Sequence, residues 1–367
     1  MRALGASCAL TAVLALLPAA SGAQGYRAMA APTATLPARY LVTLYNPTAN
    51  AATRGANVDS VEILDGHGRL LRRIEQGCCW GGDARFSPNG KVIAWVDKRG
   101  LNVENASGTR RRLLVAAAPH CVTVCIGMSY AWAPDSDTIA VGGAGPQTNE
   151  LLSVDVQTGI ATRIAPVARF TEFQVIGYSP DGRQLAVDKH SGDPGTASCC
   201  KSLLSVEHPD GTGQRLLFSF FDAIHDGPED ATWSPDGHEL AFTDDGMDTR
   251  DPRFAVVDVA TARVRRINGF VPADAPPIWS PDGTKLTAVL YVRQPIYTVS
   301  TFNLATDALT KIGLGDDPFA WYPDGTILTT GGANGNILYR LSSTGGPQRR
   351  IFTLPKPLRF LTIEPRP

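Results

Sequence analysis

A short turn motif recurs six times along the chain at nearly even spacing. It reads FSPNG, WAPDS, YSPDG, WSPDG, WSPDG and WYPDG, and its prolines are Pro88, Pro134, Pro180, Pro235, Pro281 and Pro323. Successive prolines are 46, 46, 55, 46 and 42 residues apart. A fixed period in this range is typical of propellers and solenoids, in which each repeat is one supersecondary unit.

The similarity between repeats extends beyond the turn. An aromatic residue lies two positions before each proline: Phe86, Trp132, Tyr178, Trp233, Trp279 and Trp321. An aliphatic residue lies five positions after it and a small one six after, as in Leu240 and Ala241. We interpret these positions as core, with the aromatic ring filling the gap between repeats and the small residue letting neighbouring sheets approach.

Each repeat has the pattern of four short strands. Proline presets the second position of a tight turn, Asp or Asn follows, and glycine accepts the positive φ that closes the turn. Ser136 replaces this glycine once, so we expect that turn to be strained or differently shaped. No segment has an apolar period of 3.6 residues bounded by caps, which excludes a helical repeat. Four antiparallel strands per repeat make one blade of a β-propeller.

Segments outside the six motifs supply a seventh blade. Residues 40–45, 60–64 and 70–74 match the second, third and fourth strands of a blade that lacks its first. Residues 358–363 form a short apolar run that supplies the missing inner strand, which closes the ring and removes exposed sheet edges. We therefore predict an all-β, seven-bladed propeller over residues 40–367. The alternative is six blades with an extra hairpin.

The first 23 residues have the features of a signal peptide. Arg2 precedes an apolar stretch, and the small residues 19–23 suit cleavage after Ala23, which leaves 24–39 as an N-terminal extension. An uncleaved membrane anchor is the alternative, but Pro18 interrupts a run that falls short of the ~20 residues a span needs. We expect an exported, soluble protein, periplasmic in a Gram-negative bacterium and secreted otherwise.

The net charge of -1 argues against nucleic-acid binding.

Six cysteines remain beyond the leader. They are Cys78, Cys79, Cys121, Cys125, Cys199 and Cys200. An even number in an oxidising compartment predicts disulfides, although the sequence leaves their pairing open. A zinc site is the alternative, because His120 adjoins Cys121, but no two CxxC motifs occur at the spacing of a zinc ribbon.

The repeats resemble the WD40-like PD40 repeats of TolB-like propellers. This resemblance rests on the six motifs and implies an extracytoplasmic protein-binding role. TolB has an α/β domain before its propeller, and only residues 24–39 precede the first expected strand here, which puts a Tol–Pal role in doubt. The repeats also resemble the propeller caps of prolyl oligopeptidase-type enzymes. Those enzymes need a GxSxG nucleophile motif, which this sequence lacks.

Strand order predicts two different faces. The motif turns lie on one face, which we call the motif face. The connections from second to third strands and from one blade to the next lie opposite, on the connection face. All six cysteines and the insertions 190–200 and 222–230 belong to the connection face, and long loops on one side of a repeat protein often form its binding face. We assign ten candidate binding residues to it: His120, His190, Asp222, His225, Asp226, Asp230, Asp244, Asp245, Asp316 and Asp317.

Two functions follow from this face. We predict a monomeric protein-binding or scaffold module of the cell envelope, with another protein or an envelope component as partner. The alternative is a lyase- or hydrolase-like propeller enzyme whose face histidines and acids form a metal or acid–base site at the channel mouth.

The acids could also hold Ca²⁺, which prefers several oxygen ligands. Otherwise they are solvated turn residues, and we predict no further cofactor. We interpret the basic run Arg110–Arg112 as a solvated blade edge that discourages edge pairing.

Overall fold

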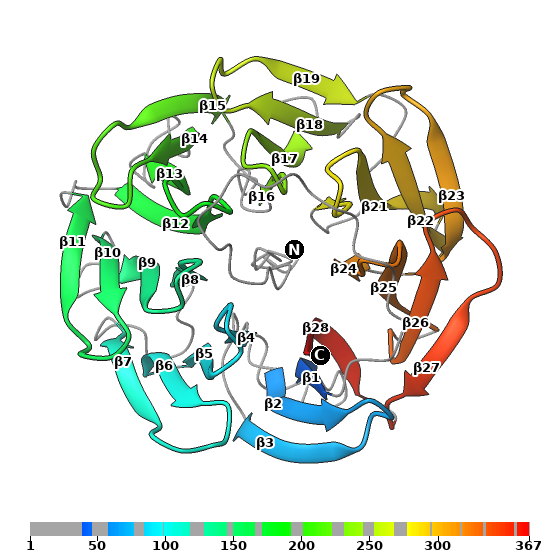
Figure 1. Ribbon diagram of the computed structural model, residues 1–367, viewed down its shortest axis with the longest axis horizontal. Helices are drawn as coiled ribbons and strands as arrows, with labels where there is room; N and C mark the ends of the chain where they lie inside the picture. The colour runs from blue at the N-terminus through cyan, green and yellow to red at the C-terminus, as the bar shows by residue number, and fades with distance from the viewer. Residues whose placement is uncertain are drawn as a thin grey trace, which may run out of the picture.

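The computed structural model describes residues 39–45, 58–76, 84–97, 99–117, 128–144, 150–165, 171–191, 201–221, 231–244, 253–267, 277–293, 296–315, 318–332, 335–355 and 358–366. These residues form seven four-stranded antiparallel sheets arranged as blades around a ring (Figure 1). The predicted seven-bladed β-propeller is therefore confirmed, and the six-bladed alternative is wrong. The described part of the chain has no helix long and apolar enough to cross a membrane.

Each blade runs from an inner strand to an outer edge strand. Blade 1 contains β28 (Arg359–Arg366), β1 (Arg39–Tyr45), β2 (Val58–Asp65) and β3 (Leu70–Gln76); blade 2 contains β4 (Arg85–Phe86), β5 (Val92–Asp97), β6 (Gly100–Asn105) and β7 (Arg112–Ala116); blade 3 contains β8 (Ser129–Trp132), β9 (Thr138–Ala144), β10 (Glu150–Asp155) and β11 (Ala161–Ala165). Blade 4 contains β12 (Thr171–Tyr178), β13 (Leu185–Ser191), β14 (Lys201–Glu207) and β15 (Arg215–Phe221); blade 5 contains β16 (Thr232–Trp233), β17 (Glu239–Asp244), β18 (Arg253–Asp258) and β19 (Val264–Ile267). Blade 6 contains β20 (Ile278–Trp279), β21 (Lys285–Arg293), β22 (Ile296–Asn303) and β23 (Leu309–Leu314); blade 7 contains β24 (Pro318–Trp321), β25 (Thr326–Gly331), β26 (Ile337–Ser342) and β27 (Arg349–Thr353).

The two ends of the chain close the ring within blade 1. β1 pairs antiparallel with β2 on one side and with β28 on the other, from Arg39 opposite Arg366 to Tyr45 opposite Arg359. Phe360 and Ile363 of β28 join a buried cluster that also contains Tyr40 of β1 and Leu328 of blade 7. The closing strand therefore joins the sheet of blade 1 and also packs against blade 7, as the sequence predicts.

The four motif turns that have a serine before the proline share one hydrogen-bond pattern. In blade 4, the Ser179 hydroxyl donates to Asp181 Oδ1 at 2.6 Å and accepts from the backbone N–H of Gln184 at 2.9 Å. The turns that begin at Ser234 and Ser280 repeat these contacts. The Asp side chain thus caps its own turn, as such residues commonly do.

The turn with Ser136 keeps the shape of the other turns and is strained at one residue. Ser136 adopts a φ of 69°, close to the 73° of Gly182 at the equivalent position. Its hydroxyl accepts a hydrogen bond of 3.0 Å from the backbone N–H of Asn89, in the motif turn of the preceding blade. This contact between turns compensates for a conformation that costs a non-glycine residue free energy.

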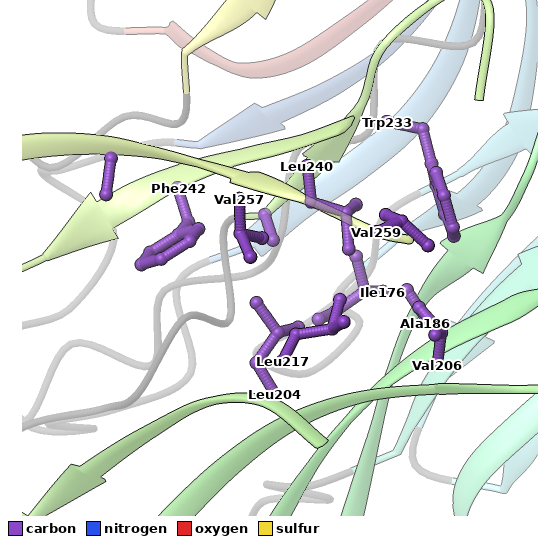
Figure 2. Packing of buried hydrophobic residues seen from close by; sticks show 12 residues of the cluster. Ile176, Ala186, Leu204, Val206, Leu217, Trp233, Leu240, Phe242, Val257 and Val259 are labelled. Carbon is purple, nitrogen blue, oxygen red and sulfur yellow. The ribbon is translucent and has the colours of Figure 1, made fainter. Parts of the chain in front are cut away.

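The core consists of clusters between adjacent blades. Figure 2 shows the cluster between blades 4 and 5, where Ile176 and Leu204 of blade 4 face Leu240 and Val257 of blade 5. The predicted small positions Ala186 and Ala241 have no exposed surface. Five of the six motif aromatic residues are buried, and Tyr178 is half-buried.

The indole of Trp233 also forms a polar link between blades. Its Nε1 donates to the backbone oxygen of Gly177 in the preceding blade at 2.9 Å. Trp279 repeats the contact one blade further on, donating to the backbone oxygen of Thr232 at 3.0 Å. Trp233 and Trp279 therefore join neighbouring inner strands by hydrogen bonds as well as by packing, whereas the indole N–H groups of Trp132 and Trp321 have no hydrogen-bond partner among the described residues.

Candidate functional site

The two faces of the ring differ in how the strands are connected. On the motif face, short hydrogen-bonded turns link the third and fourth strands of every blade and, in blades 2 to 7, the first and second strands. The connection face receives longer segments, of which 46–57, 117–128, 222–231 and 268–277 join described strands. The connecting segments that differ most in length therefore join strands on one face, as the motif spacing predicts.

Two of the ten candidate binding residues belong to described strands. His190 lies in β13 and Asp244 in β17, each near the connection-face end of the second strand of its blade. The other eight, together with all six cysteines, lie outside the described residues. The convergence predicted for the face acids and histidines therefore stays a prediction.

Asp244 is a buried ion-pair partner. Its side chain is almost inaccessible, and its Oδ2 accepts a hydrogen bond of 2.7 Å from Nε of Arg266 in β19. The Arg266 guanidinium in turn lies 5.8 Å from the ring centre of Phe218 in blade 4. Asp244 thus links the second and fourth strands of its blade and, through Arg266, the neighbouring blade. The interpretation of this carboxylate as a solvated turn residue is wrong.

Two further buried carboxylates lie in second strands and were not predicted from the sequence, Asp97 at the connection-face end of β5 and Asp188 in the middle of β13. Asp97 of β5 is 3% exposed and accepts hydrogen bonds from the Arg99 side chain and backbone. Burial opposes its ionisation, but these hydrogen bonds outweigh burial and hold the pKa of Asp97 below its usual range.

Asp188 of β13 is the more deeply buried of the two. It has no exposed surface, and the Ser202 hydroxyl lies 2.6 Å and 2.8 Å from its two carboxylate oxygens. A signal for both residues was present in the sequence, because an aspartate interrupts or ends the apolar run of a second strand in LAVDKH and in VIAWVD. A buried charge requires partners, so such an interruption indicates a built polar contact.

The described residues contain no metal centre. No group of three or more His, Cys, Asp or Glu side chains within the described ranges is arranged to hold a metal ion. Asp97, Asp188 and Asp244 belong to three different blades and each has its own partner. Ca²⁺ binding stays a prediction that concerns the undescribed connection segments.

The basic run before β7 is more than a solvated edge, which corrects the earlier interpretation. Arg111 pairs with Glu104 at 3.2 Å and with Glu75 at 3.4 Å, and its guanidinium lies 4.7 Å from the Trp95 ring centre. Arg112 donates to the backbone oxygen of Gln157 in the next blade at 2.9 Å.

Outer-strand arginines of other blades make the same kind of contact as Arg112. Arg215 donates to the Ala260 oxygen and Arg265 to the Leu304 oxygen, each at 2.6 Å and each across a blade boundary. Outer arginines therefore fasten a blade to the following one, a role that the sequence analysis missed.

No protein-family model matches the chain, and no curated protein matches it. Among solved structures, an oligogalacturonate lyase in complex with manganese aligns with a TM-score of 0.54 and 16% identity, covering 81% of this chain and 83% of that one. A prolyl endopeptidase aligns with a TM-score of 0.55 and 14% identity, covering 84% of this chain and 49% of that one. TolB from Acinetobacter baumannii aligns with a TM-score of 0.44 and 16% identity over 80% and 79%.

The likenesses to the lyase and the endopeptidase show the fold. The TolB-like propeller architecture inferred from the repeats is confirmed by the seven blades themselves. This chain spans about half the length of the prolyl endopeptidase. At such low identity the shared fold does not carry an activity, because one propeller scaffold serves unrelated functions.

Proposed function

We propose that this protein is an exported binding module of the cell envelope that holds another protein or an envelope component on its connection face. The observation that carries the proposal is the asymmetry between the faces. The motif face consists of short turns whose polar groups are satisfied within the turn, as at Ser179 and Asp181. The longer segments between described strands begin and end at strand ends on the connection face.

The strand ends beneath those segments provide a rigid base. Asp97 and Asp244 are buried at the connection-face ends of their strands, where Arg99 and Arg266 hold them, and Asp188 is buried in the middle of β13, where Ser202 holds it. Binding loops on a rigid scaffold lose less conformational entropy on association, which favours affinity.

The proposal is tested by replacing loop residues 223–229 with a Gly/Ser segment of equal length. Purified variant and parent proteins are cross-linked in an envelope fraction, and the captured proteins are quantified by mass spectrometry. We expect partners of the parent to be lost in the loop variant. The matched control changes two exposed motif-face residues, Arg183→Ser and His238→Ser, and is expected to keep them. Equal capture by all three proteins would argue against a connection-face partner.

Separate measurements test export and the enzyme alternative. The intact mass of exported protein is expected to correspond to a chain that begins near Gln24, and a mass that includes residues 1–23 would contradict processing. Stoichiometric transition metal in purified protein would favour a propeller enzyme over a binding module. Light scattering checks the expected monomer.

A further inference from the structure

Eight arginines gather along the rim of three consecutive blades. They lie in β27, β3 and β7 or in the turns just before β3 and β7: Arg349, Arg350, Arg69, Arg72, Arg73, Arg110, Arg111 and Arg112. We call this set the arginine band. The three outer strands follow one another around the perimeter of the ring (Figure 1). All eight residues lie in the first half of an outer strand or just before it, and thus near the motif face.

Contacts between neighbouring blades make the band one continuous surface. The turn before β3 packs on β27, because a Cβ at Gly68 would lie 2.4 Å from the Phe352 ring. The turn before β7 packs on β3, because a Cβ at Gly108 would lie 2.7 Å from Arg72 Nη1. Glycine permits both approaches, and it also allows the positive φ that each turn adopts.

The band has a local excess of positive charge. In blades 3 to 6, the turn between the third and fourth strands or its flank carries an aspartate: Asp155, Asp210, Asp258 and Asp307. Of the three corresponding turns in the band, those of blades 2 and 7 begin at Asn105 and Ser342 and contain no acid, and that of blade 1 carries one, Asp65. The net charge of the whole chain, -1, therefore conceals an uneven distribution around the rim.

The acids near the band already have partners. Glu62 accepts from Arg73 at 2.8 Å, and Glu104 is paired with Arg72 and Arg111. Asp65 accepts hydrogen bonds from the backbone of its own turn. Within the described part of the chain, the exposed residues Arg69, Arg110, Arg349 and Arg350 take part in no ion pair.

Exposed leucines lie among these arginines. Leu70 and Leu71 are 50% and 51% exposed, and Leu113 is 46% exposed. A polysaccharide or nucleic acid would be attracted by the charge but would not benefit from the leucines. A bilayer with anionic lipids suits both, because basic side chains are attracted to headgroups while apolar side chains enter the acyl boundary.

We propose that the arginine band docks the propeller edge-on to an anionic phospholipid surface. The arginines without ion pairs contact lipid phosphates, and Leu70, Leu71 and Leu113 enter the headgroup region. This surface is separate from the connection face, so a partner bound there stays accessible, and the inference does not depend on the proposed function.

Vesicle sedimentation tests the proposal with the full mature chain. Vesicles of phosphatidylcholine with 30% phosphatidylglycerol are expected to bind the protein at low salt, and pure phosphatidylcholine vesicles are not. The variant Arg110→Gln, Arg349→Gln, Arg350→Gln is expected to bind about 100-fold more weakly, since each basic residue near such a surface contributes on the order of 1 kcal/mol. The control Arg183→Gln, Arg263→Gln, Lys311→Gln removes the same charge elsewhere and is expected to bind like the parent.

A second variant separates the apolar contribution. Leu70→Ser, Leu71→Ser, Leu113→Ser is expected to weaken vesicle binding while its remaining affinity still falls with salt. Equal weakening in the band and control variants would overturn the proposal, because it would indicate a nonspecific charge effect. Retention on heparin without vesicle binding would also overturn it, in favour of a soluble polyanion. Circular dichroism confirms that each variant is folded.

Discussion

Glu104 and Glu207 occupy equivalent positions in blades 2 and 4, but among the described residues only Glu104 forms ion pairs with arginines. Glu104 pairs with Ile93 on the neighbouring strand, and Glu207 pairs with Leu185. Ile93 and Leu185 each lie five residues after the proline of their motif, so the two glutamates occupy the same place in their blades. Arg72 and Arg111 neutralise Glu104. Gln214 stands where Arg111 stands in blade 2, and its Nε2 lies 3.4 Å from Glu207 Oε2. Glu207 Oε1 is buried without a hydrogen-bond partner among the described residues.

Stability is therefore expected to depend on the titration of Glu207. Burial raises the pKa of Glu207 from 4.5 to about 7, with nearby Lys189 opposing and Asp210 reinforcing the shift. Between these values the folded protein binds a proton that the unfolded chain has released. The free energy of unfolding should thus fall by about 3 kcal/mol as pH rises from about 4.5 to 7 and then level off. Urea unfolding at several pH values checks this, and Glu207→Gln is expected to remove that part of the slope.

Restoring the missing cation gives a complementary prediction. Gln214→Arg places a guanidinium beside Glu207, as Arg111 is placed beside Glu104, and should raise the free energy of unfolding at pH 8 by about 1–3 kcal/mol. Thr306→Arg adds the same charge to an exposed turn of blade 6 and should change stability by less than about 0.5 kcal/mol. Equal effects of the two substitutions would contradict a specific contact with Glu207.

The last motif turn depends on Arg340. Tyr322 replaces the usual serine there, and Arg340, only 6% exposed, donates to Asp324 Oδ2 and Thr326 Oγ1, each at 2.5 Å. Its guanidinium also lies 4.4 Å from the Tyr322 ring centre. Arg340→Leu leaves Asp324 without its cation and should lower the free energy of unfolding by about 3 kcal/mol or more. Ser280→Ala, in an ordinary motif turn, should cost about 1 kcal/mol. Parallel thermal and urea unfolding compare them, and similar losses would argue against this role of Arg340.

Ring closure depends on β28. Deleting residues 357–367 removes the strand that pairs with β1 and exposes the cluster around Tyr40. The loss should reach several kcal/mol, a large share of a typical stability of ~5–15 kcal/mol. Ile363→Asp, at a buried position, should act in the same direction, whereas Ile160→Asp, at a position 65% exposed, should have little effect. A truncated protein that melts like the parent would refute closure as a source of stability.

The six cysteines give a prediction about the connection face. We expect no free thiol in the mature protein and expect mild reduction to leave the propeller folded, because the interblade clusters form without cysteine among the described residues. Thiol labelling of native protein at two or more of these positions would contradict the first expectation. Loss of the β-sheet signal on reduction would contradict the second.

Local sequence was sufficient to predict the architecture. The turn chemistry of residues such as Pro180 and Gly182 depends on backbone preferences within a few residues, so it can be recognised without a structure. Repetition of that turn with its aromatic and small neighbours predicted the blades. The unmatched runs at 40–45 and 358–363 predicted the closing pair of strands, which β1 and β28 form.

The sequence could not predict which charged groups are paired. From the sequence alone, Asp244 is interpreted as one of several loop acids, and Arg111 is interpreted as part of a solvated basic run. Both are held by residues of another strand or blade, Arg266 and Glu75 among them. Likewise, Glu104 and Glu207 are the same residue type at the same position, and only their neighbours in space distinguish them.

The physical reason is the range of the interactions. Strand and turn preferences act between residues close in the chain, and here they repeat often enough to specify the ring. Ionisation and pairing depend on burial and on cations that reach across strands and blades, such as Arg72 on Glu104, 32 residues away in the chain. Burial and register at those distances exist only once the blades have packed, so the tertiary structure decides which carboxylates form ion pairs with arginines and which, like Glu207, form none among the described residues.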